Sequence, residues 1–128
     1  MRVTKSSDGD TNQANAPIFT GGDVWVRALA GSIGGQDAAD DADFNLAVVQ
    51  FGAGARTKMH THSSEQMLYV VSGIGKVGTA DEEHTISVGD FAIIPAGEDH
   101  FHGAADTGSP MSHLAITRRD SVTEVTED

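Results

Sequence analysis

The sequence predicts an all-β fold, either a sandwich or a small barrel, and three observations support this prediction. From Phe44 onward, short runs rich in β-forming residues alternate with Gly, Pro and Asp, which is typical of strands joined by turns. The 128 residues include 15 glycines but only 5% aromatic residues, a balance that suits many tight turns. The sequence contains no clear amphipathic helical pattern. With 38% hydrophobic residues, a chain of this length can bury the core of one domain.

The expected strands follow one another at short intervals. The first covers residues 24–29, where Trp25 is expected to fill the core or to wall a cavity. A Gly- and Asp-rich loop at residues 31–43 follows and is expected to be flexible. The acidic residues 81–83 are expected to form an exposed hairpin tip. Further strands are predicted at residues 44–51, 56–62, 66–72, 76–80, 84–88, 91–95, 100–104 and 111–117.

Three segments are expected along the chain. Residues 1–17 are polar and lack periodicity, so they are predicted to be disordered. Residues 18–118 make up the predicted domain. Residues 119–128 are predicted to be a frayed C-terminal tail.

The composition argues against several classes of protein. There are no cysteines, which excludes disulfides, thiolate metal sites and cysteine nucleophiles. The net charge of -11 argues against a nucleic-acid partner. No apolar run is long enough for a membrane span or a secretory signal, so a cytoplasmic protein without a membrane partner is expected. The aspartate-rich, lysine-poor composition favours a salt-loving source, because salt screens self-repulsion; an ordinary acidic protein is the alternative.

Four side chains form a candidate metal site. His60 and His62 are two residues apart, so on a strand both imidazoles point to one face. Gln66 begins the next expected strand, and His100 begins another after a rigid Pro-Ala-Gly turn. Three imidazoles and a carboxamide oxygen suit a borderline divalent ion. The alternatives are an exposed histidine pair with His100 in the core, and Glu65 as the ligand in place of Gln66, although Glu65 is out of register.

These residues lie within two motifs that resemble those of the cupin superfamily. Gly54, His60, His62, Gln66 and Gly73 match G-x5-H-x-H-x3-E-x6-G, with Gln in the Glu position. Gly89, Pro95, Gly97 and His100 match G-x5-P-x-G-x2-H-x3-N, with Ala104 in place of the final Asn. The resemblance covers residues 54–104 and implies a double-stranded β-helix, the jelly-roll barrel of cupins. Small cupins usually pair through their sheets, which implies a homodimer.

The second half of the chain resembles a narrower group, the small manganese cupins related to hydroxynitrile lyases. The stretch from Ile94 to Ile116 carries this resemblance, together with IFTGGDV near the N-terminus. It implies one divalent ion, manganese first, with iron, cobalt, nickel or zinc as alternatives. It also implies that His102 and His113 line the cavity as proton carriers, with His113 a candidate general base. The alternative for both is a packing or supporting histidine.

Three functions follow from these expectations. The first is an enzyme that uses the metal as a Lewis acid on a small substrate, which could be an anion. A cyanohydrin lyase is the most concrete version, and a decarboxylase, isomerase or dioxygenase would use the same metal ligands. The second is a non-catalytic cupin that binds or senses a small ligand. The third is a structural or storage barrel, which would not need four converging ligands.

Overall fold

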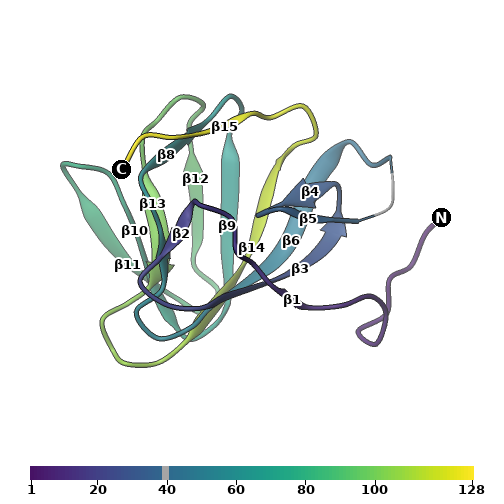
Figure 1. The fold of residues 1–128 in the computed structure, drawn as a ribbon, viewed down its shortest axis with the longest axis horizontal. Coiled ribbons are helices and arrows are strands. Elements are labelled where there is room, and N and C mark those ends of the chain that lie inside the picture. Colours follow the sequence, from purple (N-terminus) through teal and green to yellow (C-terminus); the bar gives the residue numbers. More distant parts are fainter. Residues whose placement is uncertain (39–40) are drawn as a thin grey trace.

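The computed structural model describes residues 1–38 and 41–128, and these residues form fifteen β-strands and no helix. Asp40 of the acidic loop lies outside the described residues. Within the described part of the chain, no helix is long and apolar enough to cross a membrane. Two larger sheets stack against each other, with two small two-stranded sheets at their margins (Figure 1).

The larger sheet has six antiparallel strands whose side chains alternate between the core and the outside. In β6, for example, Asn45, Ala47, Val49 and Phe51 are buried, and the residues between them are not. This alternation follows from the two-residue period of a strand. The strands lie side by side in the order β1 (Asn12–Gln13), β3 (Val24–Ala30), β6 (Phe44–Phe51), β14 (Met111–Arg118), β9 (Gln66–Ser72) and β12 (Phe91–Ile94).

The second sheet has five strands. Its order is β11 (Glu83–Ser87), β10 (Ile74–Gly78), β13 (Phe101–Ala104), β7 (Arg56–Thr57) and β2 (Phe19–Thr20). The small sheets pair β8 (His60–His62) with β15 (Thr123–Val125) and β4 (Ser32–Ile33) with β5 (Gln36–Asp37).

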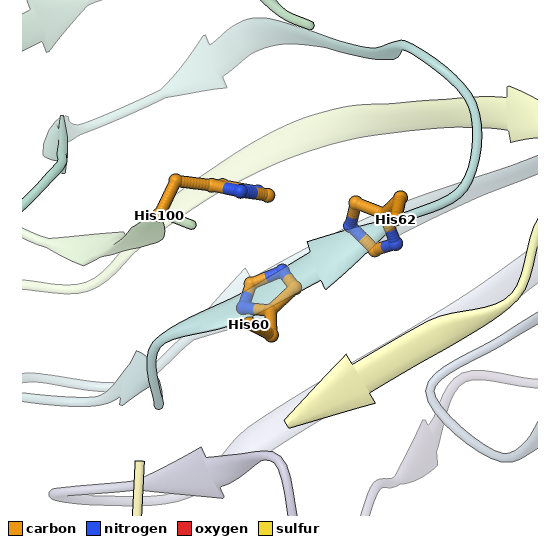
Figure 2. Close-up of side chains that lie close together, drawn as sticks. All are labelled: His60, His62 and His100. Atoms are coloured by element: carbon orange, nitrogen blue, oxygen red, sulfur yellow. The ribbon is translucent and has the colours of Figure 1, made fainter. Parts of the chain in front are cut away.

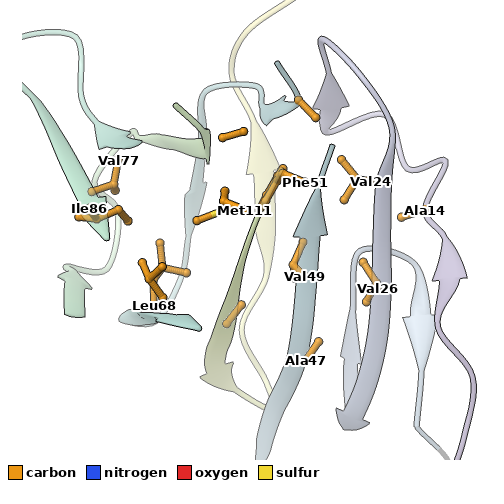
Figure 3. Close-up of a cluster of buried hydrophobic side chains, with 14 of the residues drawn as sticks. Ala14, Val24, Val26, Ala47, Val49, Phe51, Leu68, Val77, Ile86 and Met111 are labelled. Atoms are coloured by element: carbon orange, nitrogen blue, oxygen red, sulfur yellow. The ribbon is translucent and has the colours of Figure 1, made fainter. Parts of the chain in front are cut away.

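The hydrophobic core fills the space between the stacked sheets (Figure 3). Phe51, Leu68 and Met111 are its largest fully buried apolar side chains. Gly73 ends β9 with a positive φ of 74°, and a Cβ there would collide with the carbonyl oxygen of Pro110. The glycine that closes the first motif is therefore required by backbone conformation and by space.

Several segments that the composition marks as irregular take part in the sheets. Within the N-terminal segment, β1 pairs with β3, and Ala14 is buried in the core. The Gly-rich loop contains the hairpin β4–β5, and the C-terminal segment contains β15. Trp25 lies half-buried on the strand face opposite Val24 and Val26, outside the buried core. Regular pairing thus begins before residue 18 and continues beyond residue 118.

Candidate metal centre

His60 and His62 lie on β8, and His100 lies directly before β13. His60 and His62 are both buried, with Thr61 between them facing the other way. An antiparallel bridge joins His60 to His100, with backbone N–O distances of 2.9 and 3.0 Å. Figure 2 shows the His100 ring extending toward the other two imidazoles. Backbone pairing therefore sets the separation of the three rings.

The three imidazoles and Gln66 converge on a small volume. The ligand atoms of His60, His62 and His100 all lie within 4.8 Å of one another. Gln66 Oε1 lies 3.1 Å from Nε2 of His62 and 3.1 Å from Nε2 of His100. Glu65 is exposed while Gln66 is buried, as strand alternation predicts. The structure brings together the four side chains expected from the sequence.

The Nδ1 atoms of the three histidines are held by oxygen atoms outside the site. His60 Nδ1 lies 2.7 Å from the carbonyl oxygen of Lys58, and His100 Nδ1 lies 2.9 Å from that of Glu98. Because a carbonyl oxygen only accepts, both Nδ1 atoms carry the proton and both Nε2 atoms present a lone pair. His62 Nδ1 instead lies 2.8 Å from the hydroxyl oxygen of Thr123.

The contact between His100 and Gln66 fits a bound cation. The Nε2 lone pair of His100 faces Gln66 Oε1 at 3.1 Å, which places two acceptors at hydrogen-bond distance. A proton on His100 would satisfy both, but burial lowers the pKa of His100 below its ordinary value. A divalent ion between the nitrogen and oxygen donors would satisfy them without that proton.

Burial also keeps the other imidazoles of the centre neutral. Desolvation, with a smaller contribution from the neighbouring His100, lowers the pKa of His60 to about 3 and that of His62 to about 4. Neutral imidazoles keep the lone pair that a metal requires. The described donor set contains no carboxylate, so an ion bound here would keep its full charge.

A cavity of about 400 Å³ opens onto the centre. His60, His62 and Gln66 line it, together with His102. Much of the rest of its wall comes from residues 16–19, residues 32–35 and β15, which are the segments whose pairing the sequence did not predict. His100 borders a second depression, of about 440 Å³, between β11 and β12.

Two further histidines form a buried pair beside the centre. His113 Nε2 lies 3.0 Å from His102 Nδ1, and both residues pack against Phe51. His102 lines the cavity, whereas His113 is fully buried and is not among the lining residues. Among the described residues, His102 Nε2 has no hydrogen-bond partner. The structure thus places His102 at the wall of the cavity and His113 behind it.

Thr123 is the residue near the centre that sequence reasoning missed. It lies in the segment DSVTEVTED, which reads as a polar tail. The two valines of VTEV are three positions apart, so the segment has no two-residue alternation, and a strand of three residues is too short to predict from periodicity.

Comparison with known proteins agrees with this arrangement. The cupin domain family matches residues 47–117, a span that includes the four converging side chains. The chain belongs to the cupin family. Its stacked antiparallel sheets are the jelly roll of a cupin, as the two glycine-framed motifs predict.

Individual relatives extend the comparison. The (R)-mandelonitrile lyase of Granulicella tundricola is 46% identical over 85 residues, which are 64% of this chain and 63% of the relative. The match therefore spans less than two thirds of that lyase. A cupin-like protein from Thermotoga maritima superimposes with a TM-score of 0.80 at 26% identity, covering 98% of this chain and 90% of its own. The polyketide cyclase RemF from Streptomyces resistomycificus reaches 0.80 at 21% identity, over 98% and 85% of the two chains, and shows the fold alone.

Proposed function

We propose that this cupin is a metal-dependent lyase that cleaves small cyanohydrins. The observation that carries the proposal is that a four-donor centre and His102 Nε2, which has no hydrogen-bond partner in the described part of the chain, lie beside one cavity. The similarity to a mandelonitrile lyase supports the reaction class.

His60, His62, Gln66 and His100 would hold one divalent ion, manganese first, with iron, cobalt, nickel or zinc as alternatives. Bound there, the ion would supply Lewis-acid polarisation of a substrate oxygen or nitrogen. Four neutral donors leave the centre strongly positive, which favours small anions such as cyanide.

His102 is the proposed proton carrier, and His113 sets its protonation state. If His102 Nδ1–H donates to His113 Nε2 across 3.0 Å, the Nε2 atom of His102 is left with a free lone pair. Burial lowers the pKa of His102 well below its ordinary value, so the ring is neutral at physiological pH. This proposal gives His113 the role of a positioning residue, because it lies behind His102.

The proposed reaction balances with these groups. His102 Nε2 takes the hydroxyl proton of the cyanohydrin, the oxygen electron pair forms the carbonyl bond, and the carbon–cyanide bond breaks with its electrons on cyanide. His102 then returns the proton to cyanide, so the products are an aldehyde and hydrogen cyanide. The cavity of about 400 Å³ lies within the size range of small-molecule sites.

Cleavage of mandelonitrile tests the proposal. Metal-loaded protein should release benzaldehyde, and chelated protein should lose this activity. His102→Ala should retain the metal and lose about 10²-fold or more in kcat, because general-base catalysis contributes about that much. Tight binding of mandelonitrile by the loaded protein without turnover would contradict the lyase and indicate a ligand-binding cupin.

We also propose a homodimer formed through the outer face of the six-stranded sheet. Tyr69, Val71, Phe91 and Ile93 lie on β9 and on the edge strand β12 and are 43%, 41%, 52% and 56% exposed. A second copy would cover both this apolar surface and the strand edge. Light scattering should give twice the chain mass, and Phe91→Glu with Ile93→Glu should give a monomer; a wild-type monomer at micromolar concentration would contradict the dimer.

A further inference from the structure

The three imidazoles of the centre are held in two different ways. His60 and His100 each contact the carbonyl oxygen of the residue two positions earlier, and no side-chain substitution removes such a partner. His62 contacts the hydroxyl oxygen of Thr123, which lies 61 residues away in sequence. A hydroxyl can donate or accept, whereas a carbonyl only accepts. The protonation of His62 Nδ1 therefore depends on a side chain, unlike that of the other two rings.

Several contacts fix Thr123 beside His62. β15 runs antiparallel to β8, with Thr123 opposite His62 and Val125 opposite His60, and the yellow C-terminal strand follows β8 in Figure 2. The backbone N–H of Ser63 donates to the carbonyl of Val122 at 2.9 Å.

Farther along the segment, Glu127 anchors the chain end. Its carboxylate accepts from the Arg56 guanidinium at 2.9 Å and from the Met59 backbone N–H at 2.9 Å. β15 is thus attached on both sides of Thr123.

We propose that Thr123 is a positioning residue for the metal centre. It accepts the Nδ1–H of His62, which fixes the ring and leaves the Nε2 lone pair directed toward the other three donors. This inference rests on the proposed metal site and extends it to a segment beyond the matched cupin residues 47–117.

The hydroxyl can be removed with little change in shape. Thr123→Val keeps a β-branched side chain of similar size, which suits a strand. Loss of a group that supports a metal ligand typically weakens binding about 10- to 100-fold. We expect about a tenfold rise in Kd for the ion, the lower end of this range, because Thr123 is an exposed residue. Thr123→Ser keeps the hydroxyl and should bind like the wild type.

The test compares zinc and manganese affinity, by competition with a chromophoric chelator, in the wild type, Thr123→Val and Thr123→Ser. Thr126→Val is the matched control, since it removes a hydroxyl from the same segment. The Thr126 hydroxyl donates to the Asp99 carboxylate at 2.6 Å and does not contact a histidine of the centre. NMR of the zinc-loaded protein supplies a second measurement, the Nδ1–H resonance of His62. It should be protected from exchange in the wild type and Thr123→Ser and lost in Thr123→Val.

The outcomes separate this inference from the proposed function. If the wild type takes up no ion, the proposed metal site fails, whatever the variants do. If the wild type binds and Thr123→Val binds equally well, the role of Thr123 is overturned. Equal weakening in Thr123→Ser or in Thr126→Val would also overturn it, because attachment of the segment rather than the hydroxyl would then be the cause. Should Thr123→Val fail to fold, Thr123→Ala gives the same comparison.

Discussion

At the scale of single residues, the unusual feature of the candidate centre is that all four donor side chains are neutral. Gln66 occupies the position in which the cupin motif has Glu, and its Oε1 lies within 3.1 Å of two imidazole nitrogens. A carboxylate there would cancel one unit of the charge of a bound ion, whereas a carboxamide cancels none. We therefore expect the identity of this one residue to set how strongly a metal-loaded centre attracts anions.

Exchange of the carboxamide for a carboxylate tests this argument. Gln66→Glu should retain the metal, because Glu is a good ligand, and should bind cyanide or azide about tenfold more weakly. Isothermal titration of the metal-loaded wild type and variant measures both affinities. Equal or tighter anion binding by Gln66→Glu would show that charge at this position does not govern the cavity.

Residue spacing predicted which side chains of the candidate centre share one face of a strand. The two-residue period placed His60 and His62 on one face and favoured Gln66 over Glu65, and the structure agrees on both points. The depth of His113 could not be predicted in this way. It lies at a shift in register between β14 and β9, next to Ser112. Such irregularities depend on the partner strand rather than on local sequence.

At the scale of elements, two of the segments that complete the cavity, β15 and the hairpin β4–β5, are short and mostly polar. Main-chain pairing holds β15 and the hairpin β4–β5 in place. Because backbone hydrogen bonds do not depend on the type of side chain, these segments need no periodic pattern of hydrophobic residues. The long strands β6 and β14 are rich in β-forming residues, and their bounds were predicted to within one residue. Sequence patterns therefore predict the barrel better than the walls of its cavity.

Removal of β15 tests the contribution of the C-terminal segment. A chain that ends at Arg118 loses the pairing of β15 with β8 and the contacts of Glu127 with Arg56 and Met59. Urea unfolding should show a loss of about 2–4 kcal/mol, as several hydrogen bonds worth about 1 kcal/mol each disappear. Metal affinity should fall as well. An unchanged unfolding midpoint would mean that the segment does not support β8.

At the scale of the whole molecule, buried neutral histidines link stability to pH. Burial lowers the pKa of His60 to about 3 and those of His62 and His113 to about 4. Between these values and the ordinary 6.5, the unfolded chain binds protons that the folded chain does not. Stability therefore rises with pH through this window and is lost as the pH falls from about 6.5 toward 4.

Urea unfolding of the metal-free protein measures this linkage. Each histidine that stays neutral in the folded state contributes about 1.4 kcal/mol per pH unit within the window. The unfolding midpoint should be nearly constant from pH 7 to 8 and should fall steeply from pH 6.5 to 5. His113→Phe, which removes one such group, should flatten the fall; an equally steep profile would assign the dependence to other groups.

The metal centre is tested most directly by anomalous scattering from crystals of the protein grown with manganese or zinc. The arrangement of the four donors predicts one strong peak, about 2.0–2.3 Å from Nε2 of His60, His62 and His100 and from Oε1 of Gln66. A crystal of the correctly folded protein with no ion among these side chains would contradict the proposed centre.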